Sequence, residues 1–152
     1  MTTLLTEFKT ITNALNQTGI EYAVCGGWAM AIHGLPRATM DIDLLILSKD
    51  LDRVLDVAKT NGFDIEGLPL HFDIEIRRIS KMDRETKQLI TLDLLLASEE
   101  HQNLWASRQK IAWREGEAFV VSREGLIQMK RLAGRTQDLA DIEKLTEAMN
   151  EN

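Results

Sequence analysis

Two aspartates one residue apart, Asp41 and Asp43, open the apolar run DIDLLIL. In a strand, residues i and i+2 point to the same face about 6.6 Å apart, so the two carboxylates would project in parallel while Ile42 packs behind them. Carboxylates that close repel each other unless water screens them, they share a proton, or a cation lies between them. The spacing alone is weak evidence for a metal site, because Asp73 and Glu75 repeat it in FDIEIR.

The surroundings of the aspartate pair strengthen the case for chemistry. Upstream, Gly26 and Gly27 end one expected strand and begin an expected helix. Such a turn lets a phosphate approach the backbone and meet free amide groups at a helix N-terminus. Downstream, Asp93 interrupts the apolar run LITLDLLLA, where a lone charge is costly unless it is paired or binds a metal. If this strand neighbours DIDLLIL, about 4.8 Å away, three carboxylates converge.

Three carboxylates beside a phosphate-binding turn suit Mg²⁺, which prefers oxygen ligands and commonly bridges carboxylates to substrate phosphates. Two such ions about 3.5 to 4 Å apart can activate a hydroxyl and stabilise a leaving pyrophosphate. Zinc is disfavoured, because the chain has one cysteine, Cys25, and no Cys/His cluster of zinc spacing. The residues therefore predict magnesium-dependent phosphoryl or nucleotidyl transfer. Motifs of P-loop proteins, serine hydrolases and zinc proteases do not occur in the sequence.

Alternating helices and strands must position these residues. Helical spacing of apolar residues over 4–17 predicts a first helix, followed by a strand in IEYAVCG and a short helix in GWAMAIHG. DIDLLIL is expected to be a strand, with Ser48 as the N-cap of a helix over KDLDRVLDVAKTNG. FDIEIRRI and LITLDLLLA are further strands, and KIAWREGEAFVVS reads as a hairpin turning near Glu115 and Gly116.

The C-terminal third is expected to be a helical pair, with Ser122 and Thr136 as the two N-caps. No repeat, linker or composition break divides the chain, so we expect one domain over 1–152, with a core over about 1–121 and the helices over about 122–150. The fold class is α/β (α+β).

Composition limits the classes of partner. A net charge of -6 argues against broad attraction to nucleic acid. No apolar run approaches the roughly 20 residues of a membrane span, and the start lacks the profile of a secretion signal, so we expect a cytoplasmic protein. One basic cluster is expected to form a solvated loop: Arg77, Arg78, Lys81, Arg84 and Lys87. Cys25, Trp28 and His33 are expected to pack in the interior rather than take part in chemistry.

The combination resembles the nucleotidyltransferases with a DNA-polymerase-β-like core, whose signature is a Gly-Gly or Gly-Ser turn, an Asp-x-Asp strand and a third acid on a neighbouring strand. Here these are Gly26 and Gly27, Asp41 to Asp43, and Asp93 in ITLDLLL. The spacer RATMDID is similar to the Arg-x-Thr-x-Asp-x-Asp form of stand-alone members. The tail LIQMKRLAGRTQDLADIEKL resembles that of small AbiEii-like abortive-infection nucleotidyltransferases. The matches extend over residues from about 24 to 145.

The resemblance implies a mixed β-sheet core flanked by helices, and a role for each matching residue. Asp41 and Asp43 would hold the Mg²⁺ or Mn²⁺ ions that bind a nucleoside triphosphate. Asp93 would complete the second metal site and help deprotonate the acceptor hydroxyl, while Gly26 and Gly27 would hold the triphosphate. Three cations would face the nucleotide: Arg37, Lys130 and Arg135. Surface ion pairing for Arg37, and pairing with Asp138 or Asp141 for Arg135, are the alternatives.

The resulting hypothesis is a Mg²⁺-dependent enzyme that transfers a nucleoside monophosphate to an acceptor hydroxyl and releases pyrophosphate. The acceptor could be a tRNA end, a protein side chain or a small molecule such as an aminoglycoside. The resemblance to abortive-infection toxins favours tRNA or protein, and suggests a cognate antitoxin or other partner protein. The alternative is a catalytically silent nucleotide-binding module that acts through a partner protein.

Overall fold

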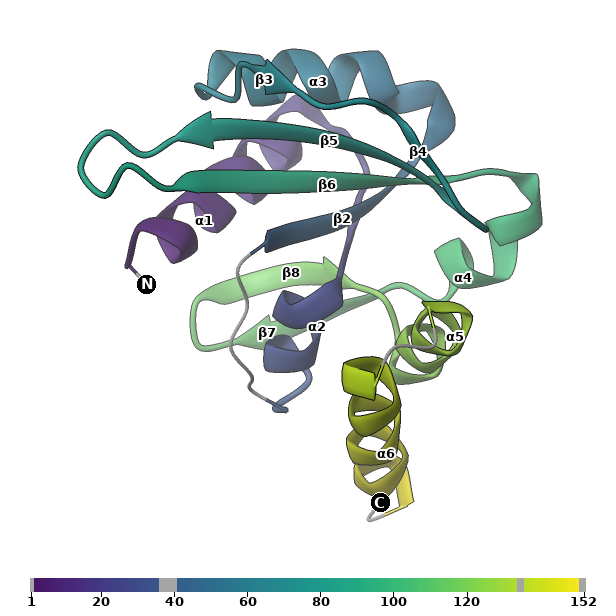
Figure 1. The fold of residues 1–152 in the computed structure, drawn as a ribbon. Helices are drawn as coiled ribbons and strands as arrows, with labels where there is room; N and C mark the ends of the chain where they lie inside the picture. Colours follow the sequence, from purple (N-terminus) through teal and green to yellow (C-terminus); the bar gives the residue numbers. More distant parts are fainter. Residues whose placement is uncertain (1, 36–40, 134–135, 151–152) are drawn as a thin grey trace.

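The computed structural model describes residues 2–35, 41–133 and 136–150 (Figure 1). Its helices are α1 (Thr2–Thr18), α2 (Gly26–Ile32), α3 (Leu51–Thr60), α4 (Gln102–Ala106), α5 (Arg123–Ala133) and α6 (Thr136–Asn150), with short 3-10 turns at η1 (Ser48–Asp50) and η2 (Glu99–His101). Its strands are β1 (Ala23–Cys25), β2 (Asp41–Leu47), β3 (Ile65–Glu66), β4 (Leu70–His71), β5 (Glu75–Met82), β6 (Leu89–Ala97), β7 (Gln109–Trp113) and β8 (Gly116–Val120). None of the helices within these ranges is both long and apolar enough to cross a membrane.

The strands form one mixed sheet in the order β3-β5-β6-β2-β1-β8-β7, and β4 also pairs with β5. β2 runs parallel to β6 and β1 parallel to β8, whereas the other pairs are antiparallel. The mixed α/β class expected from the sequence is confirmed. The two aspartate-bearing strands, β2 and β6, are direct neighbours near the middle of the sheet (Figure 1).

β2 and β6 are strands because they are buried along most of their length. Ile42, Leu44 and Ile46 of β2 and Leu92 and Leu94 of β6 are all fully buried. Strands covered on both faces read as nearly continuous apolar runs, which is why these two segments stand out in the sequence. The apolar stripe of α1 is buried in the same core, and α1 lies beside α3 behind β5 and β6 in Figure 1.

Several element boundaries differ from the expectations. α2 begins at Gly26, one residue before the expected GWAMAIHG, so both glycines belong to the helix. Ser48 was expected to cap α3, but it lies in η1 and its hydroxyl donates to the carbonyl of Ala97, 3.2 Å away. Ser122 does cap α5, accepting a hydrogen bond of 3.0 Å from the amide of Gly125. The β7–β8 hairpin forms as expected.

The expectation that the basic cluster forms a solvated loop is wrong. Arg77, Arg78 and Lys81 lie on β5, which pairs along its whole length with β6. Arg84 and Lys87 lie in the turn between the two strands. Lys81 is 2.8 Å from the carboxylate of Glu7 on α1. The cluster is therefore split between a sheet strand and its turn, and its members have separate roles.

Candidate active site

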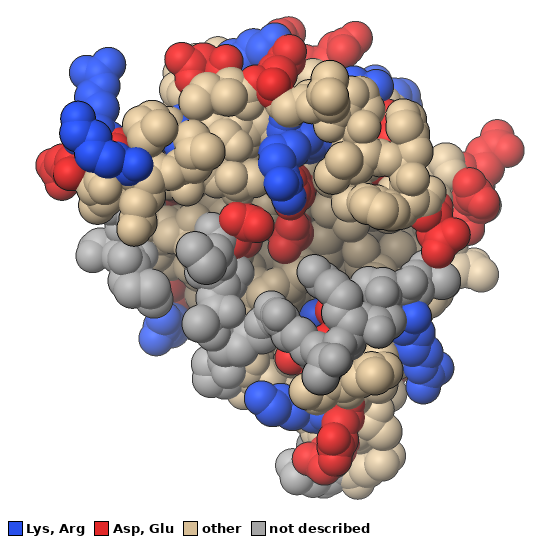
Figure 2. All heavy atoms as spheres, viewed as in Figure 1, with Lys and Arg blue, Asp and Glu red and all other residues tan. Residues whose placement is uncertain are grey.

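The carboxylates lie in one cross-strand row. In the sheet register Arg78 of β5 faces Asp93 of β6, Asp93 faces Asp43 of β2, and Asp43 faces Cys25 of β1. Asp41 lies on the same strand two residues before Asp43. On the face seen in Figure 2, acidic and basic side chains meet near the middle of the molecule, where β2 begins in the matching view of Figure 1.

Gly26 lets Asp43 lie against the start of α2. A Cβ built on Gly26 would be 2.0 Å from Oδ2 of Asp43, far inside van der Waals contact. The backbone φ of Gly26 is also +64°, in the left-handed region that favours glycine. Both observations explain why a residue without a side chain begins the helix, and they place the glycine pair beside the aspartate pair.

The site is short of positive charge. Burial, and then the charges of Asp93 and Asp41, raise the pKa of Asp43 to about 7. Burial and the charge of Asp93 also raise the pKa of Asp41. Lys130 and Arg78 act in the opposite direction on Asp43 but do not cancel these effects. Burial and mutual repulsion raise the pKa values of these acids. A cation added to the site would lower them again and stabilise the carboxylate forms.

Asp93 already has a cationic partner. Nε of Arg78 is 2.7 Å from Oδ1 of Asp93 and Nη2 is 3.0 Å from Oδ2, a two-point contact that engages both carboxylate oxygens. Asp93 itself is only 7% exposed. Sequence reasoning missed Arg78, although a charge inside an apolar strand predicts a partner on an adjacent strand.

The donor set partly fits a divalent cation. Asp41 and Asp43 offer the hard oxygen ligands that Mg²⁺ requires, at a position that lacks positive charge. Asp93 offers oxygens that Arg78 occupies. In the part of the chain that the structure describes, no three His, Cys, Asp or Glu side chains converge closely enough to hold a metal ion without rearrangement. The structure therefore brings the three aspartates side by side with the third bound to an arginine.

Lys130 joins the two C-terminal helices. It is 7% exposed, its Nζ donates to Oδ2 of Asp141 over 3.0 Å, and it lies 3.8 Å from Oδ1 of Asp138. Asp138 and Asp141 belong to α6, so the lysine of α5 holds the two helices together. The other two expected cations, Arg37 and Arg135, lie outside the described residues.

Of the three residues expected to pack in the interior, Cys25 and Trp28 are buried, whereas His33 is half-buried and lines the cavity described below. Cys25 is buried, and burial raises its thiol pKa. Trp28 is 8% exposed and stacks on Phe8 with ring centroids 4.5 Å apart. Nε2 of His33 lies 2.8 Å from the carbonyl oxygen of Val121.

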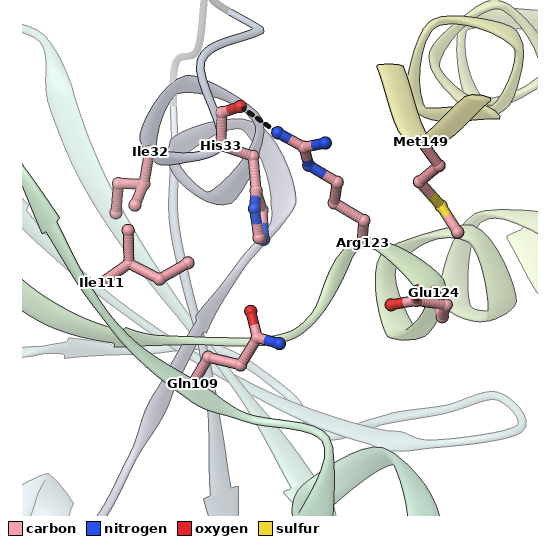
Figure 3. A pocket seen from close by; sticks show the side chains of 7 residues that line it. All are labelled: Ile32, His33, Gln109, Ile111, Arg123, Glu124 and Met149. Atoms are coloured by element: carbon pink, nitrogen blue, oxygen red, sulfur yellow. Dashed lines mark hydrogen bonds between the residues drawn. The ribbon is translucent and has the colours of Figure 1, made fainter. Parts of the chain in front are cut away.

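A separate cavity of about 500 Å³ lies at the C-terminal end of α2, away from the glycine pair (Figure 3). Arg123 donates to the carbonyl of His33 over 3.2 Å at its rim. Met149 of α6 lies across from Ile32 and Ile111 in Figure 3. None of the three aspartates lines this cavity.

Comparisons with known proteins identify the family and the fold. Residues 7–130 match the family model for aminoglycoside-2''-adenylyltransferase. The structure of ANT(2'')-Ia in complex with adenylyl-2''-tobramycin is similar with a TM-score of 0.69 at 16% identity, covering 98% of this chain and 90% of that one. A Thermotoga maritima structure described as that of a nucleotidyltransferase gives a TM-score of 0.65 at 16% identity over 97% and 93% of the two chains. At these identities the likeness shows the fold. A search of curated protein sequences found no match.

Proposed function

The chain belongs to the aminoglycoside-2''-adenylyltransferase family of nucleotidyltransferases, and from that premise we propose that it is a Mg²⁺-dependent enzyme that transfers AMP from ATP to an acceptor hydroxyl. The observation that carries the proposal is the row formed by Asp43 and Asp93, with Asp41 beside it, on adjacent buried strands. A structural role does not explain why Asp43 is buried beside two other acids, although burial and the charges of those acids raise its pKa to about 7.

Asp41 and Asp43 would hold the ion, which supplies positive charge at the α-phosphate and at the leaving pyrophosphate. Asp93 would orient the acceptor hydroxyl and accept its proton as the oxygen attacks the α-phosphorus. The bond from that phosphorus to the pyrophosphate breaks, and pyrophosphate leaves. The amides of Gly26 and Gly27 would bind the triphosphate, with Arg37 and Arg135 as further phosphate ligands. Lys130, held by the α6 acids, would act on the site through its charge on Asp43.

For the acceptor we propose a small molecule rich in hydroxyl and amino groups. The family description and the adenylyl-2''-tobramycin bound to ANT(2'')-Ia support this class. The net charge of -6 also favours a cationic acceptor over tRNA, because like charges repel. Transfer to tRNA or protein, as part of a toxin–antitoxin pair with a cognate partner protein, is the competing proposal and an outcome of the test below.

One observation favours the silent alternative, a nucleotide-binding module that acts through a partner protein. Arg78 engages both oxygens of Asp93, so in this arrangement the carboxylate has an arginine where an acceptor hydroxyl would bind. A module of this kind would bind nucleotide without transferring it. The two functions therefore differ in a measurable way.

The test measures transfer of label from [α-³²P]ATP by the protein in the presence of Mg²⁺. The acceptors supplied in turn are tobramycin, total tRNA and cell-extract protein. Asp43→Asn should abolish transfer, while Asp73→Asn, an exposed aspartate with the same i, i+2 acidic neighbour, should leave it unchanged. Full transfer by a folded Asp43→Asn protein would refute the proposal. Nucleotide binding without transfer to any acceptor would favour the silent module. Labelling of tRNA or of protein would favour the toxin-like activity.

A further inference from the structure

Arg78 occupies a position that a divalent cation would compete for. Its guanidinium binds both oxygens of Asp93, one strand away from Asp43 and beside the pair formed with Asp41. It is thus the resident cation of the acidic row. The hydrogen bonds to Asp93 and the charge of Asp93, with smaller effects from the charges of Asp41 and Asp43, raise the pKa of Arg78.

The side chain of Arg78 is free to change partner. It is 46% exposed, whereas the Asp93 side chain that it contacts is 10% exposed. The aspartate is fixed in the sheet, while the arginine reaches it from the solvent side on a long flexible stem. Moving the guanidinium would break two part-buried hydrogen bonds to Asp93, so a divalent cation or an acceptor hydroxyl must take the place of the arginine at that carboxylate.

Two groups would then compete for one carboxylate. A divalent cation held by Asp41 and Asp43 would repel the guanidinium and attract the carboxylate of Asp93, which faces Asp43 in the sheet register. A nucleoside triphosphate bound with that cation would bring phosphate oxygens toward the aspartates and offer the guanidinium a second partner. A planar guanidinium binds phosphate through the same two-point geometry that it uses for a carboxylate.

We propose that Arg78 is an exchangeable ligand, which covers Asp93 in the metal-free protein and transfers to the nucleotide phosphates when the divalent cation binds. The inference rests on the proposed function, because it assumes a metal–nucleotide site at the aspartates. It assigns Arg78 two consecutive partners and releases Asp93 for the acceptor hydroxyl only after metal and nucleotide are bound. The arginine thereby prevents Asp93 from acting before the substrate is in place.

If Arg78 exchanges partners, its removal should strengthen the binding of Mn²⁺ and weaken the binding of the nucleotide. A purely structural role does not predict these opposite effects. Arg78→Met removes a cation that competes for Asp93, so Mn²⁺ alone should bind more tightly, by about threefold or more. The same change removes a charge-assisted phosphate contact, so the Mn²⁺ complex of the ATP analogue with an α,β-methylene bridge should bind about tenfold to a hundredfold more weakly. Isothermal titration calorimetry measures both affinities without turnover.

Arg77→Met is the matched control. Arg77 precedes Arg78 on β5, has a side chain that is 37% exposed, and pairs with Glu75 instead of Asp93. Its loss changes the net charge by the same amount, so it should leave both affinities within about twofold of wild type. Arg78→Lys retains the charge without the two-point fork, and should restore Mn²⁺ binding to near wild type but nucleotide binding only in part.

Weaker Mn²⁺ binding by Arg78→Met would overturn the exchange, since it would mean that Arg78 positions Asp93 for the metal. Unchanged nucleotide affinity would overturn it as well. In either case the proposed function stands if wild type still binds Mn²⁺ and the nucleotide. If wild type binds neither, the proposed function fails and the inference fails with it.

Discussion

Gly26 and Asp43 share a space too small for a methyl group: a Cβ on Gly26 would lie 2.0 Å from Oδ2 of Asp43. The first residue of α2 and the central carboxylate of β2 are therefore fitted to each other. Any side chain on Gly26 must displace either the carboxylate or the start of the helix. This contact links the expected phosphate-binding turn to the expected metal ligand.

Gly26→Ala should destabilise the protein by about 2–4 kcal/mol, combining the cost of a left-handed backbone with overpacking against Asp43. Gly19→Ala is the control, because Gly19 has a φ of +72° but nothing within 4 Å of its built Cβ. It should cost only about 1 kcal/mol. Urea denaturation measures both values. Equal losses in the two variants would mean that the close contact with Asp43 has no energetic consequence.

The metal-free protein should lose stability as pH rises from about 4 to about 7. Asp43 has a pKa of about 7 in the folded protein and an ordinary value of 3.8, so the folded state binds more protons across this range. Above pH 7 the loss is complete. Asp43→Asn should therefore be more stable than wild type at pH 8, by on the order of 2–4 kcal/mol, and the two should converge near pH 4.

Thermal or urea unfolding in the presence of EDTA at several pH values measures this difference. Asp73→Asn, which removes an exposed aspartate, should follow the wild-type curve. A lower stability of Asp43→Asn at pH 8 would show that the Asp43 charge stabilises the metal-free fold, contrary to its position among acids.

Lys130→Met should cost about 3–5 kcal/mol, because Asp138 and Asp141 are 1% and 3% exposed and would lose the cation between them. The neighbouring Arg131→Met removes an exposed cation from the same helix and should change stability by less than about 0.5 kcal/mol. If Lys130 mainly contacts nucleotide, its replacement would instead spare urea stability and weaken nucleotide binding.

Trp28→Phe should be close to neutral for stability. The indole Nε1 of Trp28 is buried with no hydrogen-bond partner among the described residues, so its removal relieves an unsatisfied donor. Phenylalanine retains an aromatic ring to stack on Phe8. Trp28→Ala, which removes the ring, should cost about 3–5 kcal/mol. Comparable losses in both variants, measured by thermal denaturation, would indicate that the indole nitrogen is satisfied in solution.

Local sequence determined the elements that carry the candidate site. DIDLLIL and LITLDLLLA form strands at the predicted residues because both runs are apolar enough to be buried on either face. Ser122 caps α5 because its hydroxyl reaches the amide of Gly125, three residues along the chain. A cation-binding role for the aspartates could also be proposed, since residue type alone distinguishes hard oxygen ligands from thiolate or imidazole ligands.

Tertiary structure alone decided which groups meet. Arg78 and Asp93 are 15 residues apart and become partners through the antiparallel register of β5 and β6. Asp43 faces Asp93 only because β2 and β6 pair in parallel with a fixed register. A shift of one residue in either pairing would turn these side chains to the opposite face. Periodicity identifies a strand but not its neighbour or register, which depend on burial summed over the whole sheet.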